Sequence, residues 1–241
     1  MLVICLYFNA ALMPALAETV ALTTGQDDPP FTDSKRADGG IATRVVLEAF
    51  RTAGTQPKLD WLPWKRGYSL TKSGTYQASF PYLKTAKREQ DFLFSDPIFS
   101  DPSYLWIRTG DTLSADQPEG FKGRTICVPQ NYHSPLQDLL AQQIAGGKVK
   151  VERPETPDKC VQMLAAGRID ALSGEDEEIA GPLKALGQAD RISRSAAPLA
   201  RLDFRVIFPR DTPGSAALLD RFNTALQRMR DDGRYATLMA R

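Results

Sequence analysis

Strand-like and helix-like segments alternate along the chain, and the alternation runs through twice. Residues 19–23 alternate polar and apolar side chains as a half-buried strand does, and residues 41–53 then place apolar side chains on one helical stripe. The same succession restarts at residues 125–128, beyond a polar stretch at 109–119. Two rounds are typical of two α/β units, with parallel-rich sheets and helices on both faces. In such sheets, ligands bind beyond the carboxyl ends of the strands.

Two strand-like segments connect the predicted units. Residues 103–108 lead out of the first unit, and residues 203–209 lead back to it. We therefore predict a first lobe over residues 18–106, a second lobe over residues 107–206 and a return to the first lobe over residues 207–241. Two crossing strands make a two-strand hinge, about which the lobes can close on a small molecule.

The first 17 residues are typical of a signal peptide. Residues 1–17 carry no charge, are nearly all apolar and end in Ala15-Leu16-Ala17, a small-x-small cleavage pattern. A membrane anchor is the alternative, but the run is shorter than the roughly 20 residues that a spanning helix needs. We predict export to the periplasm. The 241-residue chain has a net charge of +1 and no nucleic-acid motif, so we expect no nucleic-acid partner.

The cysteines point to one disulfide. An exported protein enters an oxidising compartment, where disulfides persist. Cleavage after residue 17 would leave Cys127 and Cys160 as the two thiols of the mature chain, and we predict a bridge between them; two buried free thiols are the alternative. With His133 as the single histidine, the chain has no His/Cys cluster with metal-ligand spacing, so we predict no metal.

Residues 80–97 carry the chemistry of a small-anion site. Thr85 can cap a short helical turn, which leaves backbone N–H groups and the guanidinium of Arg88 facing one point. Arginine presents a planar fork that grips a carboxylate through two hydrogen bonds. The backbone N–H of Leu83 is a further donor. The alternative is that Arg88 is one solvated charge in a basic run.

This stretch also carries a resemblance to a known family. Thr85-x-x-Arg88, followed by Phe94-Ser95-Asp96-Pro97, resembles the family 3 solute-binding proteins, the bacterial periplasmic receptors that deliver polar amino acids to ABC transporters. Pro30-Phe31, Gly167-Arg168-Ile169-Asp170-Ala171 and the C-terminal helix extend the resemblance over nearly the whole mature chain. It implies a two-lobed periplasmic binding protein of type II, in which Thr85 and Arg88 receive the carboxylate of the ligand.

The resemblance also implies an acidic residue that binds the positively charged end of the ligand. Five positions beyond Asp170 the family often has an acid that accepts an α-ammonium group, and here that position is Glu175, with Asp176, Glu177 and Glu178 as neighbouring acids. The alternative is an acidic helix N-terminus, which the helix dipole stabilises anyway. The expected ligand-binding residues are Arg88, Thr85, Glu175, Asp28, Phe31, Trp64, Leu83 and Gln130. The alternative for Asp28 and Phe31 is that they form a plain turn without contacting a ligand. The alternative for Trp64 is that it is a core residue.

The expected function is therefore binding, without catalysis and without a cofactor. We expect a monomeric periplasmic receptor that captures a small carboxylate-bearing solute by hinge closure and delivers it to ABC transporter membrane subunits. One alternative is an enzyme like the cyclohexadienyl or arogenate dehydratases, which resemble the same family, with Glu175 as general acid. The other alternative is a sensory or accessory binding module that works without a transporter.

Overall fold

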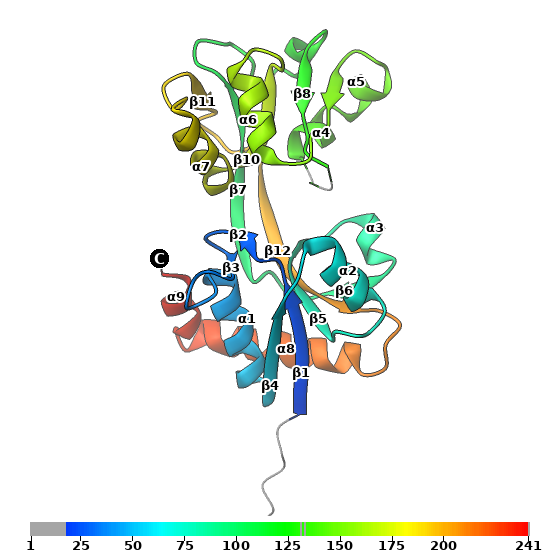
Figure 1. Cartoon of the computed structure of the whole chain (residues 1–241). Coiled ribbons are helices and arrows are strands. Elements are labelled where there is room, and N and C mark those ends of the chain that lie inside the picture. Colours follow the sequence, from blue (N-terminus) through cyan, green and yellow to red (C-terminus); the bar gives the residue numbers. More distant parts are fainter. Residues whose placement is uncertain (1–17, 131, 133, 241) are drawn as a thin grey trace, which may run out of the picture.

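The computed structural model describes residues 18–130, 132 and 134–240, so the predicted signal peptide and His133 lie outside the described residues. The described chain forms two lobes joined by two long strands (Figure 1). The first lobe contains β1 (Glu18–Thr24), β2 (Asp27–Asp28), β3 (Thr32–Asp33), α1 (Ile41–Thr52), β4 (Thr55–Trp61), α2 (Trp64–Lys72), β5 (Ala78–Leu83), α3 (Ala86–Glu89) and β6 (Phe92–Phe94).

The chain crosses between the lobes twice. The first crossing strand is β7 (Phe99–Arg108), and β12 (Ala200–Pro209) returns to the first lobe, where α8 (Ser215–Asp231) and α9 (Arg234–Met239) follow. Between the crossings, the second lobe contains η1 (Pro118–Phe121), β8 (Thr125–Cys127), α4 (Pro135–Leu139), α5 (Ala141–Ala145), β9 (Lys150–Glu152), α6 (Pro157–Ala165), β10 (Ala171–Glu175), α7 (Asp176–Leu186) and β11 (Ile192–Arg194). The predicted boundaries 106/107 and 206/207 fall inside β7 and β12, and they stay a prediction.

One mixed sheet runs through both lobes in the order β4-β1-β5-β12-β7-β10-β8-β9. Pairing is parallel in the outer part of each lobe, between β1 and β4, β1 and β5, β8 and β9, and β8 and β10. Pairing around the crossing strands is antiparallel. In Figure 1 the carboxyl end of β1 points up toward the second lobe, and β10 ends beside the gap between the lobes. Strands from both lobes therefore end near the gap between the lobes.

Three aromatic rings anchor the base of the crossing. The ring of Phe99 on β7 stacks on Phe204 of β12 at 4.7 Å between centroids and on Phe31 at 4.2 Å. The side-chain hydroxyl of Ser100 donates to Asp203 across the two strands at 2.6 Å. Phe31 is 8% exposed and belongs to the first-lobe core. It therefore holds the loop that carries Asp28 against the crossing strands.

The elements differ from the sequence pattern where strands pair over long distances. The pattern predicts a strand that ends at Phe80, whereas β5 continues to Leu83 because Leu83 pairs with Phe204. β7 likewise begins at Phe99 rather than at residue 103, since its first residues pair with β12. The start signal at Ser134-Pro135 predicts one helix to about Ala145, but the helix is broken at Leu140 into α4 and α5.

The predicted disulfide is present. Cys127 at the end of β8 is bonded to Cys160 in α6, with 5.8 Å between the Cα atoms. Both residues are at most 1% exposed and belong to an apolar cluster of the second lobe. The bond ties a strand of the sheet to the helix that covers it.

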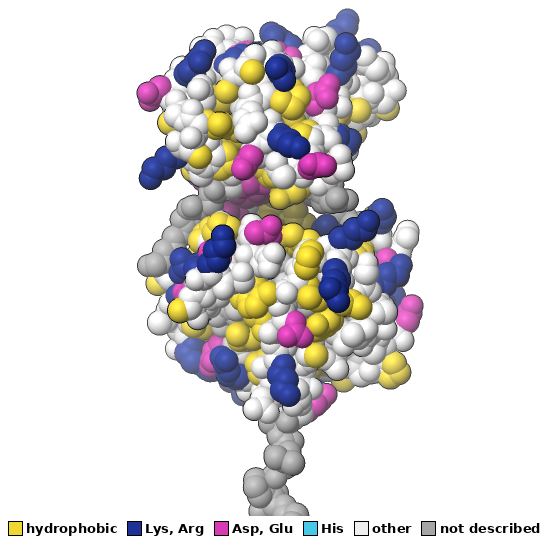
Figure 2. Space-filling view, viewed as in Figure 1, with side chains coloured by type: hydrophobic (Ala, Val, Ile, Leu, Met, Phe, Trp, Pro, Cys, Tyr) yellow, Lys and Arg dark blue, Asp and Glu magenta, His cyan; other side chains and the backbone are white. Residues whose placement is uncertain are grey.

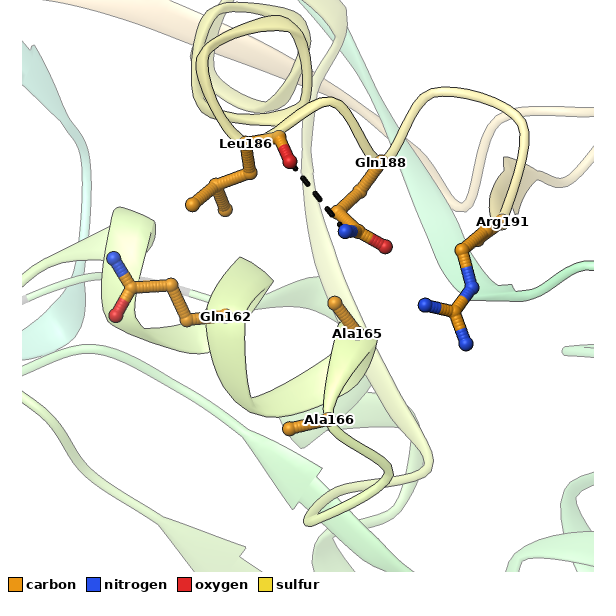
Figure 3. A pocket seen from close by; sticks show the side chains of 6 residues that line it. All are labelled: Gln162, Ala165, Ala166, Leu186, Gln188 and Arg191. Atoms are coloured by element: carbon orange, nitrogen blue, oxygen red, sulfur yellow. Dashed lines mark hydrogen bonds between the residues drawn. The ribbon is translucent and has the colours of Figure 1, made fainter.

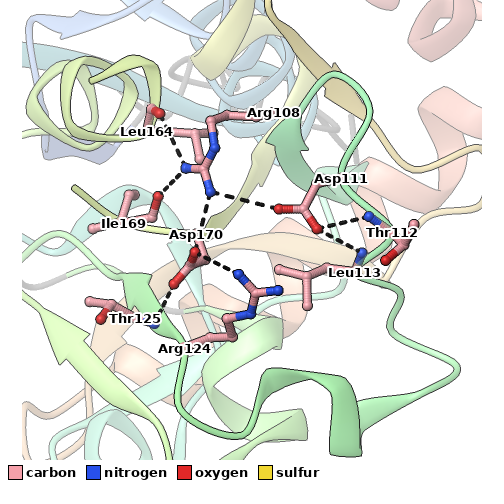
Figure 4. Close-up of polar contacts among 9 residues, drawn as sticks. All are labelled: Arg108, Asp111, Thr112, Leu113, Arg124, Thr125, Leu164, Ile169 and Asp170. Carbon is pink, nitrogen blue, oxygen red and sulfur yellow. Dashed lines mark hydrogen bonds and ion pairs between the residues drawn. The ribbon is translucent and has the colours of Figure 1, made fainter. Parts of the chain in front are cut away.

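Asp170 connects the ends of three strands in the second lobe: the last residue of β7, the start of β8 and the start of β10 (Figure 4). Its Oδ2 accepts a hydrogen bond from the backbone N–H of Thr125 at 2.8 Å, and its Oδ1 lies 3.2 Å from a guanidinium nitrogen of both Arg108 and Arg124. Burial raises the pKa of Asp170, but the hydrogen bonds from Thr125 and Arg108 and the charge of Arg124 outweigh it and lower the pKa overall. Asp170 therefore has a structural role in this lobe.

Replacing Asp170 by asparagine should destabilise the protein at neutral pH by about 1–2 kcal/mol, because two partly exposed ion pairs are lost. A carboxylate whose pKa is lowered by folding contributes stability above its unfolded pKa, and that contribution is lost as the pH falls through the folded value. The difference between variant and parent in urea unfolding should therefore shrink in acid. Asp220→Asn, on the exposed face of α8, is the matched control. A constant difference across pH would contradict the role of the charge.

Candidate ligand-binding site

The candidate site lies in the crevice between the lobes. Figure 2 shows the molecule constricted between two masses, with acidic side chains on both sides of the constriction. On the first-lobe side, the loop after β1 carries Asp27 and Asp28 on the short strand β2. On the second-lobe side, β10 ends at Glu175, which is also the residue that precedes α7. Both lobes therefore contribute carboxylate side chains to the crevice.

Five carboxyl groups gather in the crevice. Burial and the negative charges of Glu175, Asp27 and Asp101, with burial the largest cause, together raise the pKa of Asp28 to about 7. Part of the Asp28 residue remains accessible, but its carboxyl group is surrounded by protein. Glu175 comes from the other lobe, so its effect on Asp28 shows that the lobes face each other here. Burial and the charges of Glu175 and Asp28 also raise the pKa of Glu178 well above its usual range.

Glu178 is positioned by the first turn of α7. Its carboxyl accepts a hydrogen bond from the backbone N–H of Glu175, the arrangement in which the third helical residue caps the helix start. It also shares a hydrogen bond with the carboxyl of Glu175, which requires a proton on one of the two. Its Oε2 lies over Gly174, where a Cβ would come within 2.9 Å of it and within 2.8 Å of Ile179. Gly174 therefore makes room for the acid pair.

Trp64 forms an aromatic wall on the first-lobe side. Its indole lies flat against the backbone of Gly25, where an added Cβ would meet the ring at 2.0 Å. The indole Nε1–H donates to Asp27 Oδ1 at 3.1 Å, and the ring meets Tyr82 edge-on at 5.9 Å. Trp64 is half-buried, so one part packs on the small cluster around Tyr82 while another stays accessible beside Asp27.

Arg88 lies at the capped turn expected from the sequence. Thr85 precedes α3, and its hydroxyl accepts a hydrogen bond from the backbone N–H of Arg88 at 3.3 Å. The guanidinium donates to the carbonyl of Leu83 at 2.8 Å and lies 5.3 Å from the ring centre of Tyr82. Burial lowers the pKa of Arg88, and the neighbouring Tyr82 and Tyr68 partly offset this. Among the described residues no acid forms an ion pair with Arg88, which leaves its positive charge uncompensated.

The remaining predicted residues lie around this centre. Gln130 is exposed, and its side-chain amide donates to the carbonyl of Arg153 at 3.1 Å within the second lobe. Phe31 is buried in the aromatic stack, and so its ring is directed to the core. Of the acids that competed with Glu175, Asp176 pairs with Arg194 at 2.9 Å. The side chain of Glu177 lies outside the described residues.

Four residues of the crevice are absent from the expected set of ligand-binding residues: Asp27, Asp101, Glu178 and Tyr132. For Glu178, the signal that points to it is its spacing of three residues from Glu175 at a helix start. Tyr132 lies in the loop after β8 and is 50% exposed. Burial of the phenol and the charges of Glu178, Asp28, Asp27 and Glu175 raise the pKa of Tyr132. Nothing local in the sequence separates Tyr132 from an ordinary loop tyrosine.

Two depressions lie on the surface, one away from the acid cluster and one at its edge. A pocket of about 270 Å³ opens between α6 and the far end of α7, lined by Gln162, Ala165, Ala166, Leu186, Gln188 and Arg191 (Figure 3). A second, of about 430 Å³, adjoins the β2–β3 hairpin and includes Asp27 in its lining. Within the described ranges, no three His, Cys, Asp or Glu residues are arranged to hold a metal ion. Nor does any helix in the described part have the length and apolar character needed to cross a bilayer.

Solved structures similar to this chain share its two-lobed architecture. The ligand-binding core of GluR0 from Nostoc punctiforme, in complex with L-glutamate, is 20% identical with a TM-score of 0.67, over 91% of this chain and 96% of that chain. A putative L-cystine ABC transporter protein from Listeria monocytogenes is 18% identical with a TM-score of 0.69, over 92% and 94%. A histidine kinase sensor domain with similarity to periplasmic binding proteins is 19% identical with a TM-score of 0.72, over 92% and 94%.

The fold is that of a type II periplasmic binding protein, a mixed α/β protein with two lobes and two crossing strands. Residues 20–241 match the family of bacterial extracellular solute-binding proteins, family 3, and the chain belongs to this family. No curated protein matches the chain by sequence.

Proposed function

We propose that this protein is a periplasmic receptor that captures a small solute with a carboxylate and an ammonium group and delivers it to an ABC transporter. The observation that carries the proposal is the meeting of Asp28 and Glu175, which come from different lobes, in one crevice beside Trp64. Arg88, positioned by hydrogen bonds to the Thr85 hydroxyl and the Leu83 carbonyl, supplies the opposite charge on the first-lobe side.

The proposed mechanism is reversible closure about β7 and β12. Arg88 takes the carboxylate of the ligand, and Glu175 takes its ammonium group. A ligand that bridges the lobes binds the closed form more tightly than the open form, and this difference in affinity shifts the population toward closure. Trp64 covers the hydrocarbon part of the ligand. Family membership and importer-related neighbours support the transport role.

A screen of amino acids and small carboxylates by thermal unfolding tests this function. At about 1 mM, a ligand with a dissociation constant of roughly 10 μM should raise the melting temperature by about 5–10 °C, because it binds only the folded state. Scattering in solution should show a smaller radius of gyration with the same ligand. A screen in which no solute of this class raises the melting temperature would overturn the proposal.

A sensory role is the second candidate, and a specific likeness favours it. Two of the similar structures are a histidine kinase sensor domain and a domain of BvgS from Bordetella pertussis, the latter 19% identical with a TM-score of 0.69. Deletion of the gene separates the roles. A transport receptor predicts loss of uptake of the labelled ligand, whereas a sensory module predicts normal uptake and a lost cellular response.

A further inference from the structure

The ring of Tyr82 contacts two residues of the proposed site. The indole of Trp64 meets it edge-on, with 5.9 Å between the ring centres and 88° between the ring planes. The guanidinium carbon of Arg88 lies over the same ring, 5.3 Å from its centre. Trp64 begins α2 and Arg88 lies in α3, so Tyr82 on β5 connects an aromatic and a cationic residue that come from two different elements.

Tyr82 is itself held from several sides. It is 7% exposed and lies in β5, which pairs with β1 along one edge and with β12 along the other. It belongs to a small buried cluster with Phe92 and Ile207, and Tyr68 of α2 packs on its ring at 5.9 Å between centres. Tyr68 in turn meets Phe92 at 4.9 Å. A close-packed ring of this kind has little freedom to move, so it can fix the side chains that rest on it.

The aromatic contact suits a guanidinium that must receive a carboxylate. A cation over the face of an aromatic ring is attracted by the ring quadrupole, and the attraction is stronger where water is partly excluded. Arg88 is half-buried, and its guanidinium donates a hydrogen bond to the carbonyl of Leu83 at 2.8 Å. An acid in the place of Tyr82 would occupy the planar fork and compete with the ligand. The ring stabilises the charge through its face and leaves the remaining N–H groups available.

Trp64 is constrained by the same ring. Its indole lies flat on Gly25, donates through Nε1–H to Asp27 at 3.1 Å and meets Tyr82 with its rings edge-on. An indole held by these three contacts presents its remaining surface to the crevice in one fixed orientation. In the proposed function, that surface covers the hydrocarbon part of the solute.

We propose, on the basis of that function, that Tyr82 is a positioning residue that fixes Arg88 and Trp64 relative to each other without touching the ligand. Recognition of the carboxylate and recognition of the hydrocarbon part then depend on one buried ring. Because both side chains are held before binding, the ligand does not have to order them on arrival, and this lowers the entropic cost of binding. The site therefore selects solutes whose carboxylate and apolar group stand at a fixed separation.

Side-chain NMR without ligand tests the positioning directly. The Nε–H resonance of Arg88 is assigned by its loss in Arg88→Lys, and the indole N–H resonance of Trp64 by its loss in Trp64→Phe. In the parent, the Arg88 resonance should lie upfield of those of exposed arginines, because the guanidinium lies over the ring of Tyr82. Tyr82→Leu should return it toward the exposed values and move the Trp64 resonance, whereas Tyr82→Phe keeps the ring and should change both little.

Titration calorimetry tests the consequence for binding. The probe is the common L-amino acid that raises the melting temperature of the parent most at about 1 mM. Tyr82→Leu should weaken binding of this amino acid by about 10-fold, the size expected from loss of one partly desolvated cation–π contact. Tyr82→Phe should bind it within about 2-fold of the parent, because a phenylalanine ring can still lie under the guanidinium.

Phe50→Leu is the matched control for a loss of stability. Phe50 on α1 is buried against Phe208 and Phe222, in a different apolar cluster from Tyr82. This variant should lower the melting temperature about as much as Tyr82→Leu but leave the affinity and both resonances unchanged. If Tyr82→Leu does not fold, Tyr82→Met takes its place, and the position of the Arg88 resonance in the parent remains a test by itself.

The outcomes separate this inference from the proposed function. An Arg88 resonance that lies among those of exposed arginines in the parent, or that does not move in Tyr82→Leu, would overturn the positioning role and leave the receptor function standing. Equal losses of affinity in Tyr82→Leu and Phe50→Leu, or in Tyr82→Leu and Tyr82→Phe, would also overturn it. A screen in which no amino acid or small carboxylate raises the melting temperature would overturn the receptor function, while the two resonances would still decide whether Tyr82 holds Arg88 and Trp64.

Discussion

Replacing Arg88 by alanine should weaken the binding of a carboxylate ligand by about 100-fold. The guanidinium is partly buried against Tyr82, and no acid of the described chain compensates its charge. Truncation of one partner of a buried, hydrogen-bonded charge pair costs about 3 kcal/mol, which is the stated factor in the dissociation constant. Titration calorimetry with the best amino acid from the thermal screen measures it.

Two controls make this result specific to the carboxylate. Lys87→Ala removes the exposed cation beside Arg88 and should change the affinity little. Arg88→Lys keeps the charge but loses the planar fork, and should fall between alanine and the parent. An amine that matches the ligand but lacks its carboxylate should bind the parent and Arg88→Ala equally. A carboxylate ligand that binds Arg88→Ala as tightly as the parent would remove Arg88 from the site.

Removal of the Cys127–Cys160 disulfide should cost about 3–4 kcal/mol of stability, because a bond between residues 33 positions apart restricts the unfolded chain. For a chain of this size, that loss lowers the melting temperature by about 7–14 °C. Both sulfurs lie in the core of the second lobe, so the paired alanine variant adds a small cavity to this effect.

Reduction of the parent protein distinguishes the bond from the cavity. The parent with dithiothreitol should lose most of the same stability, while the paired alanine variant should not respond to the reductant. Scanning calorimetry should place the loss in the second lobe, with the transition of the first lobe little changed. A reduced parent that unfolds at the temperature of the oxidised one would contradict the prediction.

Features that depend on neighbouring residues are predictable from the sequence. The capped turn at Thr85 and Arg88 is present because the cap and the N–H it binds are three residues apart. The helical stripe of α1 is buried because its period matches the helix. The disulfide was predictable because only two thiols follow the predicted signal peptide.

Features that depend on docking were not predictable. Successive side chains of a helix point about 100° apart, so the identity of the acid that faces the crevice depends on how α7 packs. Packing directs Asp176 to Arg194 and buries Glu178 beside Glu175. Phe31 follows a turn, and from its position we expect a residue that lines the ligand cleft. Its ring instead stacks on Phe99, and only the pairing of the sheet brings Phe99 next to it.

By itself, the sequence determined the α/β alternation, the two crossings, the capped arginine and the disulfide, because each depends on local spacing or on the count of one residue type. The tertiary structure alone decided that Asp28 and Glu175 share a crevice, where the charge of Glu175 helps to raise the pKa of Asp28. The physical reason is that charge repulsion and burial depend on distances across two lobes. Those distances exist only after β7 and β12 have paired and set the lobes opposite each other.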